Sequence, residues 1–362
     1  MQHKTILRVL LAGFCILTAV RELPAQGLKK IRWGQTSIGA SQWIPWIAKD
    51  MKFYEKNGLD MEIILLRGSG QTSQAMIGGS IFASPVTTAT LMTANLSGAD
   101  LTTVAHTVSV VQGRMLAKPE IRKAEDLKGK KVASSGLGSL GDFMYRVIMR
   151  KYGLNPDKDI NWITVGTPPE RLQALAAGSV DAADLSYPSD VRGEKMGFRV
   201  LWDARAEVPY PSMSVVTRKK SIQEDRDGVM RMMRAHVEGI HFLKTQKEAS
   251  LKILAKYLRT DDRELLDGSY DIYSKDFIPT PYPIVTGLKL AYEQVAQRRP
   301  EIYKEDFLAT PYPITQGLAT TYEYVALRRP EIYNHKPEEF TDPSFIAELD
   351  KSGFIKKLYA SK

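Results

Sequence analysis

A glycine-rich loop is the part of the sequence with the clearest potential for chemistry. Residues 130–142 read K-K-V-A-S-S-G-L-G-S-L-G-D, a short apolar strand followed by the pattern G-x-G-x-x-G at Gly136, Gly138 and Gly141. A helix is predicted directly afterwards, over residues 143–152. Backbone N–H groups of the loop and the positive end of that helix therefore converge on one point, which is suited to an anionic or strongly polar ligand.

The same glycine pattern is also the fingerprint of dinucleotide-binding proteins. That fingerprint needs an acidic residue at the end of the next strand to hold a ribose hydroxyl. Here the next predicted strand, residues 161–165, ends in Gly166 and Thr167, and the nearby acids Asp157 and Asp159 precede it. A loop for a small ligand therefore fits better than a nucleotide site, and a purely structural tight turn is the third interpretation.

Polar residues follow most of the other predicted strands as well. Ligands of open α/β sheets bind beyond the carboxyl ends of the strands, so residues directly after each strand are candidates. Hydroxyl and N–H groups dominate them, which suits a neutral polar or singly anionic ligand, and two aromatic rings offer stacking faces. Each could instead be an ordinary loop or cap residue. The candidate ligand-binding residues are Ser37, Gln42, Trp43, Ser69, Gln71, Ser84, Thr87, Ser135, Gly138, Ser139, Leu140, Ser186 and Tyr187.

The residues typical of catalysis or metal binding are sparse. His236 and His241 are five residues apart on a predicted helix, which puts them on different faces and not at the i, i+4 spacing of a metal-binding pair. No Ser-His-Asp set or carboxylate pair with catalytic spacing stands out. We therefore expect no catalytic residues, no metal and no cofactor.

The first 25 residues have the plan of a secretory signal peptide. Lys4 and Arg8 precede an apolar run over residues 9–20, and we expect cleavage after Ala25 and export to the periplasm. Cys15 is the only cysteine and lies in that run, so the exported chain has no disulfide or thiolate metal site. The bulky residue before this cysteine disfavours a lipoprotein signal. No later stretch is long and apolar enough to predict a membrane anchor.

Composition and charge are those of a soluble globular protein and do not favour nucleic-acid binding. The 362 residues are 43% hydrophobic and carry a formal net charge of +9. The basic residues are spread along the chain, without the basic runs interleaved with aromatics that strand-binding proteins use. We interpret the charge as a source of solubility and of some steering of anions, and we expect no nucleic-acid partner.

Alternating strand and helix patterns predict an α/β protein with two lobes. A β-α-β unit begins at residue 29, and the same logic starts again near residue 118. We expect lobe 1 to contain residues 26–115 and 214–362, and lobe 2 to contain residues 116–213. Two chain crossings, near residues 113–118 and 210–214, would then form a hinge beside a central ligand cleft.

Several local motifs predict where helices begin and end. Thr167 and Glu170 form a capping box around two prolines, and Gly178 ends the helix that they open. Another capping box at Ser221-x-x-Glu224 predicts the start of a long helix. Gly79-Ser80-Ile81-Phe82-Ala83 and Gly178-Ser179-Val180-Asp181-Ala182 both pass from a helix into a short strand, which suggests two similar halves.

A 30-residue unit occurs twice near the C-terminus. Residues 276–303 recur as residues 306–333, and 19 of the 28 aligned positions are identical. Two copies are too few for a solenoid, which needs about three to bury a continuous core. We interpret the unit as a tandem duplication of a surface helix. The alternative is a dimer or partner surface made by Pro281-Tyr282-Pro283 and its twin Pro311-Tyr312-Pro313.

Five stretches in a characteristic order carry a family resemblance. They are residues 46–63 (W-I-A-K-D-M-K-F-Y-E-K-N-G-L-D-M-E-I), 119–134, 153–160, 174–183 and 342–359. Together they make the chain resemble the substrate-binding proteins of ABC importers for nitrate, taurine, alkanesulfonates and thiamine precursors, the group with the SsuA/THI5-like domain. The resemblance implies a type II periplasmic binding protein fold with a helical C-terminal tail.

The resemblance also implies function and partners. The implied function is that of a solute-binding protein, a monomer that captures a sulfonate, nitrate, pyrimidine or similar molecule and passes it to ABC transporter permease subunits. The alternative is an enzyme similar to the thiamine-pyrimidine synthases of the family. It is disfavoured because these enzymes use a cysteine-rich motif, whereas the chain that we expect after signal cleavage contains no cysteine. Two features depart from the family pattern: Phe82 stands where an aspartate is usual, and the 30-residue repeat is extra.

Overall fold

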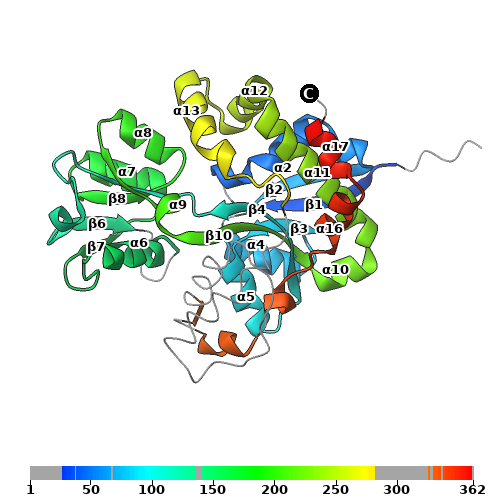
Figure 1. Ribbon diagram of the computed structural model, residues 1–362, viewed down its shortest axis with the longest axis horizontal. Coiled ribbons are helices and arrows are strands. Elements are labelled where there is room, and N and C mark those ends of the chain that lie inside the picture. Colours follow the sequence, from blue (N-terminus) through cyan, green and yellow to red (C-terminus); the bar gives the residue numbers. More distant parts are fainter. Residues whose placement is uncertain are drawn as a thin grey trace, which may run out of the picture.

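Two α/β lobes lie side by side and are joined by long strands in the middle of the molecule (Figure 1). A computed structural model of the chain describes residues 27–36, 38–66, 68–134, 140–281, 325–326, 329–335 and 337–360. The predicted signal peptide, most of the glycine-rich loop and most of the repeat therefore lie outside the described residues. The α/β fold class with two lobes is confirmed.

The sheet of the first lobe has the strand order β2-β1-β3-β10-β4. Strand β1 runs parallel to β2 and β3, as the β-α-β pattern predicts, whereas β10 is antiparallel to both β3 and β4. The strands are β1 (Lys29–Gln35), β2 (Leu59–Leu65), β3 (Ala83–Val86), β4 (Leu101–Val110) and β10 (Pro209–Arg218). The helices between them are α2 (Trp43–Asp50), α3 (Phe53–Lys56), α4 (Gly68–Ile77) and α5 (Thr88–Leu96), with the 3-10 turn η1 (Ala40–Gln42) before α2.

The sheet of the second lobe repeats this plan with the order β7-β6-β8-β5-β9. Strand β6 is parallel to β7 and β8, and β5 is antiparallel to β8 and β9. The strands are β5 (Arg114–Ala117), β6 (Lys131–Ser134), β7 (Asn161–Thr164), β8 (Ala182–Leu185) and β9 (Arg199–Asp203). The helices are α6 (Leu140–Lys151), α7 (Pro168–Ala176), α8 (Ser189–Lys195) and α9 (Ala204–Glu207), with η2 (Ala124–Leu127) before β6.

The predicted similarity of the two halves is confirmed in the turns that lead into β3 and β8. Gly79 and Gly178 have φ of +76° and +72°, a conformation that favours glycine. The next residue in each turn donates its N–H back to the helix, Ser80 to Ala75 at 2.9 Å and Ser179 to Ala174 at 3.0 Å. Both helices therefore end in the same type of C-terminal cap.

One predicted capping box is confirmed and one is wrong. The N–H of Thr167 donates to Glu170 at 2.7 Å, and α7 begins at the following proline. Ser221, in contrast, lies inside α10 (Lys219–Glu224). The long helix α11 (Arg226–Thr245) is instead capped by Asp225, whose carboxylate accepts from the N–H of Gly228 at 3.1 Å. Aspartate directly before the helix satisfies the free N–H groups that the predicted serine cannot reach.

The C-terminal end of the chain packs onto the first lobe. Phe345 and Ile346 are fully buried in the cluster that also contains Trp33 of β1 and Met232 of α11. The remaining helices are α12 (Lys247–Leu258), α13 (Arg263–Tyr273), α16 (Ser344–Lys351) and α17 (Phe354–Ala360), with the turns η3 (Ser274–Asp276), η5 (Pro330–Asn334) and η6 (Pro337–Phe340). Of the helices that the structure describes, none combines the length and apolar character that crossing a membrane requires. The predicted residue limits of the two lobes stay a prediction.

Two buried histidines of the first lobe give a testable pH dependence. Burial lowers the pKa of His106 to about 3 and that of His236 to about 4. Below about pH 6.5 the unfolded chain binds protons that the folded protein does not, so the free energy of unfolding falls as the pH falls. We expect up to ~1.4 kcal/mol per pH unit for each histidine, ending near the folded-state pKa values.

Urea unfolding at pH 7, 6 and 5 measures this effect. The variant His236→Gln removes one titrating group, so its stability should decline less steeply with acid than that of the unmodified protein. A free energy of unfolding that stays constant from pH 7 to 5 would contradict the assignment.

Candidate functional site

Two candidate residues from different lobes meet in the structure. Trp43 begins α2 just after β1, and Tyr187 follows β8. Their ring centroids are 5.5 Å apart in an edge-to-face arrangement, and Tyr273 of α13 lies 6.4 Å from Trp43 and 5.8 Å from Tyr187. All three rings are buried. The segments that follow a strand in each lobe are thus adjacent, as the sequence predicts for a ligand site between the lobes.

Several buried donors near this junction have no hydrogen-bond partner among the residues that the structure describes; besides Nε and Nη1 of Arg114, two of them are carried by aromatic side chains. One is the indole Nε1 of Trp43 on the first lobe, and the other is the hydroxyl of Tyr145, on α6 of the second lobe. Buried polar groups nearly always have a partner, because an unpaired one costs ~1–3 kcal/mol. These two groups are therefore candidates for contact with a ligand.

The beginning of α6 lies against a carboxyl group. A Cβ at Gly141, the last glycine of the G-x-G-x-x-G pattern, would lie only 2.2 Å from the Oδ2 of Asp184 on β8, so the close approach requires glycine. Burial raises the pKa of Asp184, and Arg171, whose guanidinium lies 3.8 Å from the carboxylate, opposes that shift. A ligand at this helix terminus would thus meet a positive helix end and a carboxyl group together.

Three of the candidate side chains already have partners within their own lobe. Gln42 is buried, and its amide donates to the hydroxyl of Thr36 at 2.7 Å. Ser84 is also buried and donates to the carbonyl of Gly34 at 2.9 Å. Thr87 caps α5 by accepting from the N–H of Thr90 at 3.3 Å. These contacts organise the loops that follow β1 and β3, and a ligand contact of these residues stays a prediction.

The other candidates divide into described and undescribed residues. Gln71 is exposed on α4, and the carbonyl of Ser186 accepts from the N–H of Ser189 at the start of α8. The backbones of Ser69 and Leu140 lie in α4 and α6. The candidates that lie outside the described residues are Ser37, Ser135, Gly138 and Ser139. For all of these, ligand binding stays a prediction.

A buried polar cluster at the end of β3 is not among the candidates from the sequence. Thr88 at the start of α5 places its hydroxyl 3.2 Å from the Nε2 of His106 on β4 and 3.2 Å from the hydroxyl of Ser214 on β10. All three side chains are buried. Thr88 directly follows the candidate Thr87, but its partners lie 18 and 126 residues further along the chain. Only the return of β10 to the first sheet brings the cluster together.

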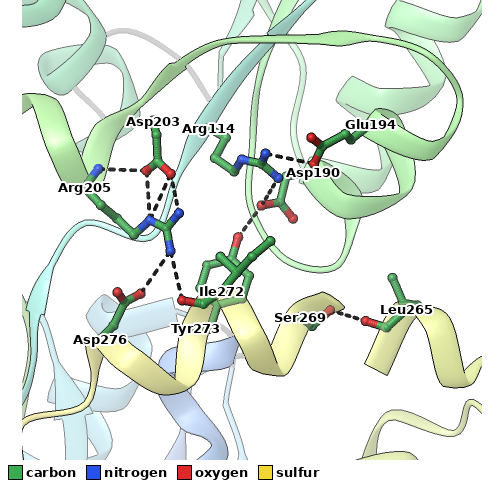
Figure 2. A network of polar contacts seen from close by, with 10 residues as sticks. All are labelled: Arg114, Asp190, Glu194, Asp203, Arg205, Leu265, Ser269, Ile272, Tyr273 and Asp276. Atoms are coloured by element: carbon green, nitrogen blue, oxygen red, sulfur yellow. Dashed lines mark hydrogen bonds and ion pairs between the residues drawn. The ribbon is translucent and has the colours of Figure 1, made fainter. Parts of the chain in front are cut away.

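Helix α13 is held against the second lobe by a buried carboxylate (Figure 2). Asp190 of α8 is fully buried, accepts from the hydroxyl of Tyr273 and lies 3.8 Å from the guanidinium of Arg114. Arg114 also donates to Glu194 at 2.8 Å. Burial raises the pKa of Asp190, while the hydroxyl and the guanidinium act in the opposite direction.

Arg205 also connects α13 to the second lobe, near the C-terminal end of that helix. Arg205 pairs with Asp203 at the end of β9 and donates to the carbonyl of Ile272 at 3.1 Å (Figure 2). Its guanidinium also lies 3.8 Å from the carboxylate of Asp276, which accepts from Gln112 at 2.9 Å. Burial raises the pKa of Asp276. The end of α13 is thus tied to the second lobe, although the helix follows β10, the last strand of the first sheet.

Two lobes built on the same strand order, joined by two crossings and with post-strand residues facing one another, define a periplasmic-binding-protein fold. The model of the NMT1/THI5-like family matches residues 44–250, more than half of the chain. The chain therefore belongs to the NMT1/THI5-like family, and the resemblance noted in the sequence is confirmed.

Solved structures with the same fold include two periplasmic binding proteins. The aliphatic sulphonate binding protein SsuA of Escherichia coli is 20% identical with a TM-score of 0.62, over 85% of this chain and 99% of that one. The nitrate-binding protein NrtA of Synechocystis PCC 6803 is 16% identical with a TM-score of 0.58, over 86% and 91%. A Brucella abortus protein named as a candidate binding protein is 28% identical over 238 residues, 64% of this chain and 70% of its own length.

The contact of α13 with the second lobe predicts a large effect of Arg205→Leu. The substitution leaves two carboxylates and the carbonyl of Ile272 without their cation at a mostly buried place, so we expect the free energy of unfolding to fall by ~2 kcal/mol. Hydrogen exchange in α13 should become faster. Chemical denaturation and mass-spectrometric hydrogen exchange measure the two effects.

The matched control is Arg263→Leu, at the beginning of α13 itself. Arg263 also contacts two carboxylates, those of Glu248 and Asp267, but both pairs are exposed to solvent. Exposed pairs contribute ~1 kcal/mol or less, so the control should unfold almost like the unmodified protein. If both substitutions lowered the free energy of unfolding equally, the contact of α13 with the second lobe would contribute no more than an exposed ion pair.

Proposed function

We propose that this protein is the extracytoplasmic solute-binding component of an ABC importer. It captures a small polar or singly anionic organic molecule between its lobes and delivers it to membrane permease subunits, acting as a monomer. Membership of the NMT1/THI5-like family and the fold shared with sulphonate- and nitrate-binding proteins support this function. The observation that carries it is the meeting of Trp43 and Tyr187, from opposite lobes, near the buried donors of Trp43 and Tyr145, which have no hydrogen-bond partner in the described part of the chain.

Capture without bond-making is favoured over an enzyme of the thiamine-pyrimidine type. The Brucella relative and the two solved structures are named as binding proteins. His106 and His236 are buried, and their lowered pKa values keep both rings neutral at physiological pH. Across the described parts of the chain, no group of three His, Cys, Asp or Glu residues is arranged to hold a metal ion.

Closure of the lobes is the signal that such a receptor passes on. A ligand that binds the closed arrangement more tightly than the open one shifts the protein toward the closed arrangement. A difference of ~3 kcal/mol in binding free energy changes the ratio of closed to open molecules more than a hundredfold.

Export through the predicted leader would place this receptor in the periplasm. Sequencing the N-terminus of the exported protein would test cleavage after Ala25.

A thermal-shift screen tests binding and narrows the ligand class. Sulfonates, nitrate, aromatic acids and pyrimidines are each added to the purified protein, and a true ligand raises the melting temperature increasingly as its concentration exceeds Kd. Small-angle scattering with the best ligand should show compaction. The proposal would be overturned if no compound class raised the melting temperature and the purified protein instead converted one of the compounds into a product.

The two unpartnered donors predict a specific pattern of affinities. Trp43→Phe and Tyr145→Phe each keep an aromatic ring but remove the N–H or O–H group. If each donor binds the ligand, each substitution should weaken binding about 5–10-fold, equivalent to ~1–1.5 kcal/mol. Calorimetric titration with the ligand from the screen measures this loss.

The control for these variants is Tyr54→Phe, which removes a buried hydroxyl in the core of the first lobe, beside His236. It should leave the affinity unchanged. Loss of affinity in the control alone, or in none of the three variants, would exclude a direct contact of Trp43 and Tyr145 with the ligand.

The carboxyl group at the start of α6 predicts how charge affects binding. Asp184→Asn removes a negative charge next to the positive end of the helix, so an anionic ligand should bind several-fold more tightly to the variant. For the same reason the unmodified protein should bind an anion more tightly as the pH falls through the raised pKa of Asp184. A neutral ligand should show neither effect. Titrations of the variant and of the unmodified protein at a series of decreasing pH values distinguish the two ligand classes.

A further inference from the structure

The tandem repeat contacts the molecule at two separate places. The structure describes the start of the first copy, residues 276–281, and much of the end of the second copy, residues 325–326 and 329–333. The start of the first copy lies along β4 near the hinge, and the end of the second copy lies beside α5 (Figure 1, orange). The 43 residues 282–324 between them are outside the described part of the chain.

The start of the first copy is fixed mainly by its backbone. The N–H of Ile278 donates to the carbonyl of Thr107 at 3.0 Å, and the carbonyl of Pro281 accepts from the N–H of His106 at 3.2 Å. Phe277 is buried in the aromatic cluster that contains Trp43. The segment thus extends the first sheet antiparallel to β4, and these contacts do not depend on the later residues of the repeat.

The end of the second copy is fixed by its side chains. Val325 is 3% exposed and Ile332 is fully buried, both against apolar residues of α4 and α5. Arg329 donates to the hydroxyl of Ser97 at 3.0 Å and to the carbonyl of Leu96 at 3.0 Å, at the C-terminal end of α5. We call this binding surface the tail groove; it is formed by Met76, Ile81, Leu91, Met92, Leu96 and Ser97.

The tail groove continues beyond the segment that fills it. A hollow of about 620 Å³ lies between α4 and α5, with Val325 in its lining. Its walls are mostly small or apolar, including Ile77, Ala89 and Thr93. The groove is therefore suited to a longer amphipathic segment of the kind the repeat encodes.

Each described residue of the second copy in this region has an identical counterpart in the first copy. The seven residues are Val325, Ala326, Arg329, Pro330, Glu331, Ile332 and Tyr333, and the counterparts are Val295, Ala296, Arg299, Pro300, Glu301, Ile302 and Tyr303. The tail groove can therefore receive the same apolar side chains and the same guanidinium from either copy. The contacts of these seven residues do not favour one copy over the other.

We propose that the tail groove binds either copy of the repeat within one molecule, so that the C-terminal tail exists in two registers. In one register residues 325–333 occupy the groove, and in the other residues 295–303 occupy it. Thirteen residues separate Pro281 from Val295, enough for a reach of ~45 Å when extended, which is comparable with the diameter of the first lobe. The cost of closing a loop rises only slowly with its length, so the extra 30 residues fit on either side of the groove.

The first experiment tests whether the first copy of the repeat can replace the second copy in the tail groove. Ile332→Asp is made in the full chain and in a chain without residues 295–324, which retains one hybrid copy. In the one-copy chain the substitution forces a carboxylate into an apolar site, so the melting temperature should fall by about 8 °C or more. In the two-copy chain Ile302 replaces the lost side chain, and the fall should be less than about 3 °C.

Two further variants complete this series. Ile302→Asp together with Ile332→Asp should destabilise the two-copy chain as strongly as the single substitution does the one-copy chain. Ile346→Asp is the matched control, because this isoleucine is fully buried in the first lobe and has no duplicate. It should lower the melting temperature strongly in both chains. An equally strong effect of Ile332→Asp in both chains would overturn the proposal.

Cross-linking tests the two registers even if a destabilised variant fails to fold. In a Cys15→Ser background, Ser97→Cys is paired with Arg329→Cys in one protein and with Arg299→Cys in another, and both are treated with a short bismaleimide. The proposal expects intramolecular cross-links in both proteins, with yields within about threefold. Cross-linking in the Arg329→Cys protein alone, or cross-links in the Arg299→Cys protein found only in dimers, would overturn it.

Discussion

Helix α13 contacts both lobes at the place where the chain crosses between them. Tyr273 packs against Trp43 of the first lobe and Tyr187 of the second, while its hydroxyl donates to Asp190. A few residues away, Arg205 of the second lobe holds the carbonyl of Ile272. The relative position of the lobes is therefore determined by a helix that comes after the whole second lobe in sequence. The meeting of the two post-strand segments depends on this helix, because Tyr273 packs against both of them.

The contacts of α13 combine an apolar cluster with buried charges, and the two contribute differently. Burial of the aromatic rings supplies most of the stabilisation, but apolar surfaces tolerate small shifts. A carboxylate such as Asp190 is tolerated in the interior only while Arg114 and the hydroxyl of Tyr273 remain in place. Misplacement of α13 by a few ångströms would take the hydroxyl of Tyr273 away from that buried carboxylate and leave it with Arg114 alone. The charged contacts thus penalise other arrangements of the lobes more than they stabilise this one.

The sequence predicts the fold where short-range rules decide, and fails where distant segments compete. The β-α-β order, the capping box at Thr167 and the paired turns at Gly79 and Gly178 follow from local patterns, and all are confirmed. The cap at Ser221 is wrong because Asp225 lies closer to the free N–H groups of α11. A hydroxyl after a strand is visible in the sequence, but its direction is not: Ser84 points to a carbonyl of its own sheet. The cluster of Thr88, His106 and Ser214 needs three distant segments, so no local pattern predicts it.

The duplication is compatible with this architecture because the two ends of the tail are held independently. Residues 276–281 extend the first sheet through backbone hydrogen bonds, whereas Arg329 and Ile332 bind the first lobe through side chains. A 30-residue insertion between two such attachments changes only the length of chain between them, and the free energy of bringing two attached ends together rises by ~0.6 kcal/mol for each doubling of that length. The same insertion between Tyr273 and Asp276 would have separated the residue that contacts Asp190 from the one that contacts Arg205, and would have broken part of the contact between the lobes. The fold therefore tolerates the repeat because of its position in the sequence. The repeated unit lies after the residues of α13 that connect the lobes and before the residues that bind the tail groove.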